Sequence, residues 1–437
     1  MKTRRNDPAK INIITLGCSK NLVDSEVLLS QLKASNKQVT HEAEHSHAGT
    51  VLINTCGFID NAKQESIETI LDFVERKKRG EIENLYVSGC LSQRYREELM
   101  AQMPEVDGFF GTTDTDLPNI LNTLGADYKQ ELVGERETTT DSHYAYLKVS
   151  EGCNRGCSFC AIPLMRGKHR SREIGFLVKE AKYLVDKGVK EIMLIAQDLS
   201  SYGVDVSGKK QLDELLKALS DIDGLAWIRL HYMYPSGFPG EILPTMAGRD
   251  NICNYMDMPI QHISSNVLKI MRRAINRERT ETLLAKIREQ VPGIALRTTL
   301  LVGHPGETEQ DHEELLDFLE RTRFDRVGVF QYSHEENTHA HTLEDDVPAE
   351  VKQQRFEDVM ILQQGISLER NRALVGKVMK TLIDGKQDDT FFGRTEYDSP
   401  EVDNRVILEE ASALHVGDFV DVEITQGLEY DLVGQVR

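Results

Sequence analysis

The chain has 437 residues, a length that allows two or three domains, each with its own hydrophobic core, and excludes a small disulfide-stapled scaffold. Its seven cysteines are too sparse for a disulfide framework and odd in number, which favours metal ligation or a redox site in a cytosolic protein. The formal charge of −19, from 71 acidic and 52 basic side chains, disfavours nonspecific binding to nucleic-acid phosphates and favours a basic partner, although acidity that only maintains solubility gives the same balance.

Neither a membrane span nor an export signal is expected. No apolar stretch approaches the ~20 residues needed to cross a bilayer. The apolar run at 11–16, which follows a basic start, is too short for the core of a signal peptide. The sequence therefore predicts a cytoplasmic protein with no membrane partner.

Residues 9–125 alternate short apolar runs with amphipathic segments, such as INIITLGC before LVDSEVLLSQLKAS and TVLINTCGFI before a helical stretch at 61–78. Alternating strand and helix signals predict a parallel, helix-flanked sheet, and thus a first α/β domain. The next segment, 126–143, is polar and poor in large apolar residues, and we interpret it as a linker.

Residues 144–374 repeat the alternation, with strand-like runs such as YAYLKVSEGC, KEIMLIAQDL and RVGVFQYS separated by helical segments. This pattern predicts a partial or full β/α barrel whose working face lies at the carboxyl ends of its strands. Residues 375–437 contain short β-branched runs punctuated by Gly and Asp, which predict a small all-β barrel. The expected fold class is α/β with a C-terminal β-barrel.

The first strand of the predicted β/α barrel ends in EGCNRGCSFCAIP, which carries Cys153, Cys157 and Cys160. Three thiolates on one loop can converge on one metal centre. A closed structural zinc site needs four ligands, commonly in two separated pairs. Three thiolates can instead hold a four-iron cubane and leave one iron free of protein ligands. A zinc site and three inert thiols are the alternatives.

A free iron offers a binding place for the amino and carboxylate groups of S-adenosyl-L-methionine, and reductive cleavage of its sulfonium yields a carbon radical. Phe159 would cover the purine of that cofactor, although ordinary core packing explains this residue equally well. Gln197 and Asp198 end another predicted strand, where barrel enzymes hold their ligands. Contact with the cofactor and capping of the loop are both consistent with that position.

The stretch YAYLKVSEGCNRGCSFCAIPLMRG resembles the signature of the radical S-adenosylmethionine enzymes and, among them, of the methylthiotransferases. That family places an iron–sulfur domain first, a radical barrel second and a small TRAM-like β-barrel third, an order that covers essentially the whole chain. The resemblance implies two 4Fe-4S clusters. It also implies S-adenosyl-L-methionine in two roles, because one molecule supplies a methyl group and another is cleaved to the radical.

Three further cysteines each close a predicted strand of the first domain: Cys18, Cys56 and Cys90. A glycine beside each lets the backbone approach a bulky inorganic group: Gly17, Gly57 and Gly89. Carboxyl ends of parallel strands share one sheet edge, so these thiols can be neighbours, although a strand-end cysteine is more often a buried apolar residue. The resemblance implies that the three hold the auxiliary cluster. Cys253 matches no ligand position and is expected to pack in the core.

Three other features carry weaker signals. MRGKHRSRE, at 165–173, is a basic run directly after the cysteine loop, and we expect a solvated loop there, with substrate contact as the alternative. HEENTHAHTLEDD, at 334–346, contains three histidines without a metal-binding period. His304, in GHPGET, stands where a bulky apolar or aromatic residue is common in the family, and we assign it no role.

Two segments and a charge imbalance indicate the substrate. LGCSKNLVDSE at 16–26 and NTCGFIDNAKQESIETI at 54–70 resemble the ribosomal-protein aspartate methylthiotransferases more closely than the tRNA enzymes. From Gly376 to Arg437 the chain has six Lys or Arg against fourteen Asp or Glu. That balance would repel RNA phosphates and attract a basic ribosomal protein.

The resemblance therefore implies methylthiolation of the β-carbon of an aspartate in the small-subunit ribosomal protein number twelve. A reductant protein is the second expected partner, and tRNA is disfavoured. A tRNA-adenosine methylthiotransferase is the alternative with the same chemistry. A non-enzymatic iron–sulfur electron carrier is the alternative from a different class.

Overall fold

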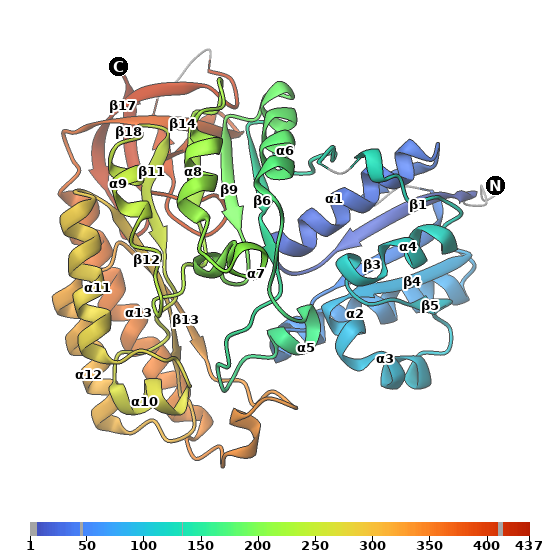
Figure 1. Ribbon diagram of the computed structural model, residues 1–437, viewed down its shortest axis with the longest axis horizontal. Helices are drawn as coiled ribbons and strands as arrows, with labels where there is room; N and C mark the ends of the chain where they lie inside the picture. The colour runs from blue at the N-terminus through green and yellow to red at the C-terminus, as the bar shows by residue number, and fades with distance from the viewer. Residues whose placement is uncertain (1–6, 44–46, 133, 410–413) are drawn as a thin grey trace.

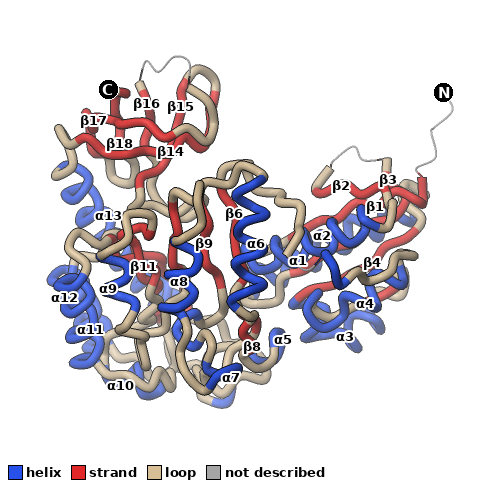
Figure 2. Tube along the Cα trace, turned by 45° about the horizontal axis from the view of Figure 1, so that its top comes forward, coloured by secondary structure: helices blue, strands red, loops and turns tan. Residues whose placement is uncertain are grey.

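A computed structural model describes residues 7–43, 47–132, 134–409 and 414–437. The chain forms an N-terminal α/β unit, a central β/α unit and a C-terminal barrel, in that order along the sequence (Figure 1). Figure 2 shows the N-terminal unit and the barrel packed against different sides of the central unit. None of the described helices combines the length and the apolar character needed to span a membrane.

The N-terminal unit is a parallel sheet in the order β2-β1-β3-β4-β5. Its strands are β1 (Asp7–Thr15), β2 (Gln38–His41), β3 (Ala48–Thr55), β4 (Asn84–Gly89) and β5 (Gly108–Phe109). Its helices are α1 (Ser19–Ala34), α2 (Asp60–Lys78), α3 (Cys90–Gln102) and α4 (Thr113–Thr123). Helices α1 and α4 cover one face and α2 and α3 the other, so β3 is buried along its whole length. The prediction of a parallel, helix-flanked sheet in the first domain is confirmed.

The segment between the first two units is anchored rather than loose. It contains a single turn of 3-10 helix, η1 (Gln130–Leu132). Arg136 is 3% exposed and pairs with Glu26 of α1 and, at 2.8 Å, with Glu180 of the central unit. The polar composition of this segment therefore reflects buried ion pairs as well as solvent contact.

The central unit is an open parallel sheet in the order β13-β12-β11-β10-β9-β6, so the expected β/α barrel is partial. Its strands are β6 (Tyr144–Lys148), β9 (Glu191–Ile195), β10 (Trp227–Leu230), β11 (Ile252–Asp257), β12 (Ala295–Val302) and β13 (Arg326–Gln331). Its longer helices are α6 (Ile174–Asp186), α8 (Leu212–Ser220), α11 (Arg277–Gln290), α12 (Glu309–Thr322) and α13 (Ala349–Arg372).

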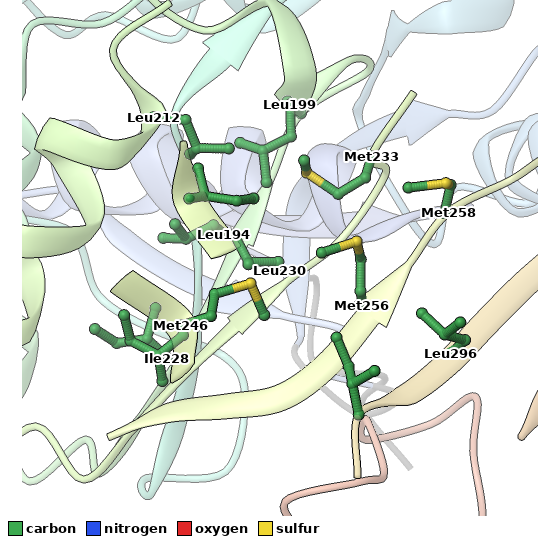
Figure 3. Packing of buried hydrophobic residues seen from close by; sticks show 14 of the residues in the cluster. Leu194, Leu199, Leu212, Ile228, Leu230, Met233, Met246, Met256, Met258 and Leu296 are labelled. Atoms are coloured by element: carbon green, nitrogen blue, oxygen red, sulfur yellow. The ribbon is translucent and has the colours of Figure 1, made fainter. Parts of the chain in front are cut away.

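Short elements complete the central unit: β7 (Ser150–Glu151), β8 (Arg170–Ser171), α5 (Ile162–Arg166), α7 (Val204–Ser207), α9 (Ile242–Ala247), α10 (Ser265–Ile270), η2 (Leu199–Ser201) and η3 (Ala340–Thr342). The helices pack on one face of the sheet over a large apolar cluster that includes Leu194, Leu230 and Met256 (Figure 3). On the other face, Tyr146 and Met193 pack against Val23 of α1. The N-terminal unit thus covers part of the open face.

The C-terminal residues form a closed barrel in the order β14-β15-β16-β18-β17, which confirms the predicted all-β unit. Its strands are β14 (Val378–Gln387), β15 (Thr390–Thr395), β16 (Val406–Leu408), β17 (Phe419–Gly427) and β18 (Leu432–Val436). The barrel packs on the amino ends of the central strands, where the rings of Phe419 and Trp227 lie 4.9 Å apart. Cys253 is buried in this contact, as expected of a packing residue.

Buried ion pairs also join the barrel to the central unit. Three of them cross the interface: Glu191–Arg394 at 2.8 Å, Arg326–Asp398 at 2.5 Å and Arg297–Asp403 at 3.3 Å. Two carboxylates that contribute to the negative charge of the barrel are therefore neutralised inside the molecule. The barrel presents less acidity than its composition indicates.

Candidate active site

Three cysteines meet at one edge of the N-terminal sheet. Cys18 precedes α1 after β1, Cys56 follows β3, and Cys90 begins α3 after β4. These strands are adjacent in the sheet, and the structure brings the three thiols together. Burial, with Cys18 and Cys56 nearby, raises the pKa of the Cys90 thiol to about 12. Metal binding by Cys90 must therefore displace a proton from its sulfur.

Glycine is required beside these thiols because the backbone approaches them closely. Gly17 has φ +89°, and a Cβ there would lie 2.7 Å from the Cβ and 2.8 Å from the Sγ of Cys56. Gly89 has φ +98°, and a Cβ there would lie 2.5 Å from the Oδ1 of Asn54. Both positions combine left-handed backbone with no room for a side chain.

The other three cysteines lie on the loop that follows β7. The backbone N–H of Arg155 donates to the Sγ of Cys153 at 3.4 Å. The Sγ of Cys157 accepts from the guanidinium of Arg273 at 3.4 Å and lies 3.5 Å from the Oη of Tyr234. Burial raises the pKa of Cys153 to about 11. Donors therefore reach the sulfurs of Cys153 and Cys157, as expected where thiolate charge must be stabilised.

The thiols form two groups of three, one in the N-terminal unit and one in the central unit. Across the described ranges, no three His, Cys, Asp or Glu side chains are placed to hold one metal ion. Three thiolates can ligate three irons of a four-iron cluster. The assignment of each group of cysteines to its own cluster stays a prediction.

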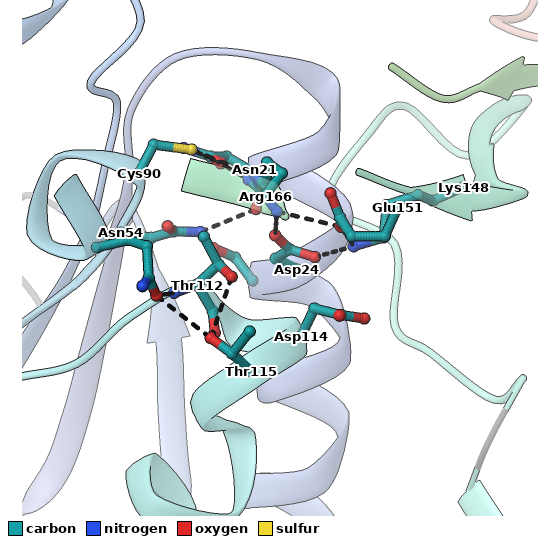
Figure 4. A network of polar contacts seen from close by, with 12 residues as sticks. Asn21, Asp24, Asn54, Cys90, Thr112, Asp114, Thr115, Lys148, Glu151 and Arg166 are labelled. Carbon is teal, nitrogen blue, oxygen red and sulfur yellow. Dashed lines mark hydrogen bonds and ion pairs between the residues drawn. The ribbon is translucent and has the colours of Figure 1, made fainter. Parts of the chain in front are cut away.

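Arg166, on α5, lies in a network of polar contacts with Cys90 and the side chains around it (Figure 4). Its side chain is buried, and its Nε donates to the Sγ of Cys90 at 3.3 Å. Its Nη1 donates to Asp24 at 2.6 Å and to Glu151 at 3.2 Å, and its Nη2 donates to Asn21. One guanidinium from the central unit thus contacts a thiol and two polar side chains of the N-terminal unit.

The same network reaches Gln197. Lys148 pairs with Asp24 and, at 2.7 Å, with Glu151. Burial alone would raise the pKa of Glu151, but Lys148 and Arg166 outweigh it and lower that pKa to about 2. The Nε2 of Gln197 donates to Glu151 at 2.6 Å, whereas its buried Oε1 has no hydrogen-bond partner within the described residues. That oxygen is available to accept a hydrogen bond from a ligand.

Phe159 lies against a small apolar cluster that includes Met271 and Tyr332. The ring of His304 meets it edge-on, with centroids 6.2 Å apart, and the Nε2 of His304 lies 3.2 Å from the Oγ of Ser158. His304 therefore supports the cysteine loop, a structural role that its position in the sequence does not indicate. Contact of Phe159 with a cofactor stays a prediction.

One segment differs from expectation, and a second, for which no position was predicted, is also partly buried. The basic run 165–173 is not a solvated loop throughout, because Arg166 and His169 are 3% and 5% exposed. In the segment 334–346, Glu335 is buried and pairs with Arg94 at 2.6 Å and Lys63 at 2.9 Å. Both segments bind the N-terminal unit to the central one. The sequence offered only one signal for these contacts: charged residues after the cysteine loop in the first segment and among the histidines in the second. Such residues are equally typical of an exposed loop.

Three family models match the chain. Residues 10–111 match "Uncharacterized protein family UPF0004", residues 147–319 match the "Radical SAM superfamily", and residues 375–436 match the "TRAM domain". Among solved structures, the radical S-adenosylmethionine methyltransferase TsrM from Kitasatospora setae, with cobalamin and a 4Fe-4S cluster bound, is similar at a TM-score of 0.56. The two chains are 14% identical, over 74% of this chain and 72% of TsrM, which establishes a likeness of fold.

Curated relatives match along essentially the whole length. The ribosomal protein uS12 methylthiotransferase RimO of Cytophaga hutchinsonii is 55% identical over 100% of both chains. The proteins of the same name from Flavobacterium johnsoniae and Bacteroides thetaiotaomicron are 54% and 51% identical, over 100% and 98% of both chains. With three domain models in the expected order and relatives of this identity, the chain belongs to the ribosomal protein uS12 methylthiotransferase RimO family.

Proposed function

We propose that the protein is a radical S-adenosylmethionine methylthiotransferase that replaces a hydrogen on the β-carbon of an aspartate of ribosomal protein uS12 with a methylthio group. Its full-length relatives carry the name of this activity. The observation that carries the proposal is the presence of two groups of three cysteines on adjoining units, with Arg166 of the central unit donating a hydrogen bond to Cys90 of the N-terminal unit.

Each group of thiols would hold one 4Fe-4S cluster. The loop of Cys153, Cys157 and Cys160 would hold the cluster that binds S-adenosyl-L-methionine, and Cys18, Cys56 and Cys90 would hold the auxiliary cluster. When bound, these groups would supply the radical that removes the hydrogen and the sulfur and methyl that replace it. Three ligands on each cluster leave one iron for a non-protein ligand.

The surrounding side chains have binding and positioning roles in this proposal. The Oε1 of Gln197 would accept a hydrogen bond from the cofactor, and Glu151 would keep the amide in that orientation. Phe159 would cover the purine and exclude water from it. Arg273 would stabilise the thiolate of Cys157.

The substrate and the chemistry also imply where the protein works and what it meets. A ribosomal-protein substrate implies a cytoplasmic site of action. Cluster chemistry requires electrons, so a reductant protein is the second proposed partner. A tRNA substrate is not favoured, because the relatives that match over the full length are named for uS12.

The substrate is tested by incubating anaerobically reconstituted protein with S-adenosyl-L-methionine, reductant and a sulfur source on uS12 or on tRNA. We expect the mass of a methylthio group on uS12 only, located by fragmentation on one aspartate. Modified nucleosides in the tRNA digest, with unmodified uS12, would contradict the proposal. Substrate prepared with that aspartate replaced by alanine is the control for the site of modification.

Gly17→Ala should remove the auxiliary cluster while the other remains. A methyl group at Gly17 would occupy space within 2.8 Å of the Sγ of Cys56, so the thiols cannot close on the cluster. We expect iron content to fall by about half, as a cluster that loses one of its positioned thiolates is not retained. Gly80→Ala is the matched control, since Gly80 also has positive φ, +73°, but its Cβ would meet nothing within 4 Å. The control should cost about 1 kcal/mol of stability and no iron.

A further inference from the structure

Lys20 is a buried lysine at the junction of the N-terminal and central units. The residue is 6% exposed, and its Nζ lies 3.1 Å from the centroid of the Tyr232 ring. For this ammonium the described part of the chain provides no hydrogen bond and no ion pair. Burial of the side chain removes part of the hydration of the ammonium, and one cation–π contact replaces only part of that loss.

The acidic residues on the same helix are already paired. Asp24, one turn further along α1, accepts from the guanidinium of Arg166 at 2.6 Å. Glu26 pairs with the buried guanidinium of Arg136. Neither carboxylate is free to turn toward Lys20 without leaving another buried cation unpaired.

The acidic residues that face this region from the other units are also occupied. Asp257 accepts from the backbone N–H of Tyr232 at 3.1 Å and pairs with Arg297 at 2.9 Å. Glu401, from the C-terminal barrel, accepts from two tyrosine hydroxyls of β6 at 3.3 Å each. Among the residues that the structure describes, the positive charge of Lys20 therefore has no dedicated counter-ion.

Lys20 lies beside the cysteines of the N-terminal unit and near the carboxyl ends of the central strands. It follows Cys18 by two residues in the first turn of α1, a helix of 16 residues with no acidic residue in that turn and no side-chain cap. The helix dipole adds to its positive potential. Tyr232 is held by the backbone N–H of Leu199, at 3.1 Å, in the loop that begins with Gln197. The ammonium is thus fixed between the auxiliary thiols and the carboxyl ends of the central strands.

We propose that Lys20 binds the side-chain carboxylate of the substrate aspartate, an inference that rests on the proposed function. The carboxylate is one bond from the β-carbon, so pairing with Lys20 holds that carbon between the two cluster sites. A neutral asparagine amide cannot neutralise the buried ammonium. Lys20 therefore selects aspartate and fixes which carbon is presented.

The test measures binding of fluorescently labelled uS12 to the reconstituted protein by anisotropy, with the target residue either aspartate or asparagine. The wild type should bind the aspartate form at least about tenfold more tightly, because the asparagine form leaves a buried charge unpaired. Lys20→Met, which keeps the length of the side chain, should reduce this ratio to about one. Lys33→Met is the matched control at the other end of α1, where the lysine is half exposed and pairs with Glu137; it should keep the wild-type ratio.

Iron content and the electron paramagnetic resonance spectrum of each variant separate binding from folding. Lys20→Met should retain both clusters, and loss of iron would make Lys20 a structural residue and overturn the inference. A retained preference for aspartate in Lys20→Met would overturn it as well. Failure of the proposed function has a different signature, since the wild type would then leave the aspartate form of uS12 unmodified.

Discussion

Replacing Cys153, Cys157 and Cys160 together with alanine should remove about half of the iron and abolish formation of 5′-deoxyadenosine. These thiols lie on one loop of the central unit, and the other three lie on separate strand ends of the N-terminal unit, so each group can hold its cluster without the other. Iron and sulfide quantification with Mössbauer spectroscopy on anaerobic protein measures the first effect. Chromatography of the nucleoside after addition of reductant measures the second.

The opposite triple variant, with Cys18, Cys56 and Cys90 replaced, should also lose about half of the iron but should still cleave S-adenosyl-L-methionine. It should not methylthiolate uS12. Cys253→Ala controls for removal of a buried thiol that ligates nothing, and it should keep all of the iron. Loss of all iron in either triple variant would point to one shared centre, and a wild type that forms no 5′-deoxyadenosine would favour an electron carrier.

The strand-end positions of the cysteines could be predicted from the sequence because the pattern is local. A strand signal that ends in a cysteine beside a glycine places the thiol at the carboxyl edge of a parallel sheet, and β1, β3 and β4 then prove to be neighbours. The glycines beside these cysteines indicate the same position in the sequence. Gly17 and Gly89 adopt the left-handed backbone that lets the chain pass beside a thiol.

The contacts between units could not be predicted in this way. Arg166 and Glu335 lie in segments whose composition is typical of exposed loops, and only the docking of the N-terminal unit buries them. The exposed charge of the barrel could not be predicted from the sequence either. Asp398 and Asp403 contribute to the negative balance of the barrel, yet each pairs with an arginine of the central unit. Side-chain counts report composition, whereas steering of a basic partner depends on the charge that remains exposed.

Arg166→Met should destabilise the protein by about 3–5 kcal/mol, because it removes one cation from a buried network and leaves its carboxylates to share Lys148. Asp24 and Glu151 would then be two buried anions beside a single ammonium. Urea denaturation of the anaerobic protein, followed by circular dichroism, measures the change. Methionine approximates the length of the arginine stem, so the loss reports charge and hydrogen bonding more than volume.

Arg170→Met is the matched control four residues further along the chain. Arg170 also pairs across the units, with Asp114, but about half of its side chain is exposed, so its loss should cost less than about 1 kcal/mol.

Adding Asp24→Asn to Arg166→Met should recover part of the stability, because it removes the carboxylate left without its cation. Equal losses of stability in Arg166→Met and Arg170→Met would contradict the prediction that the polar network around Arg166 acts as a buried unit. A larger cost for Arg166, together with a changed reduction potential of the auxiliary cluster, would follow from its hydrogen bond to Cys90.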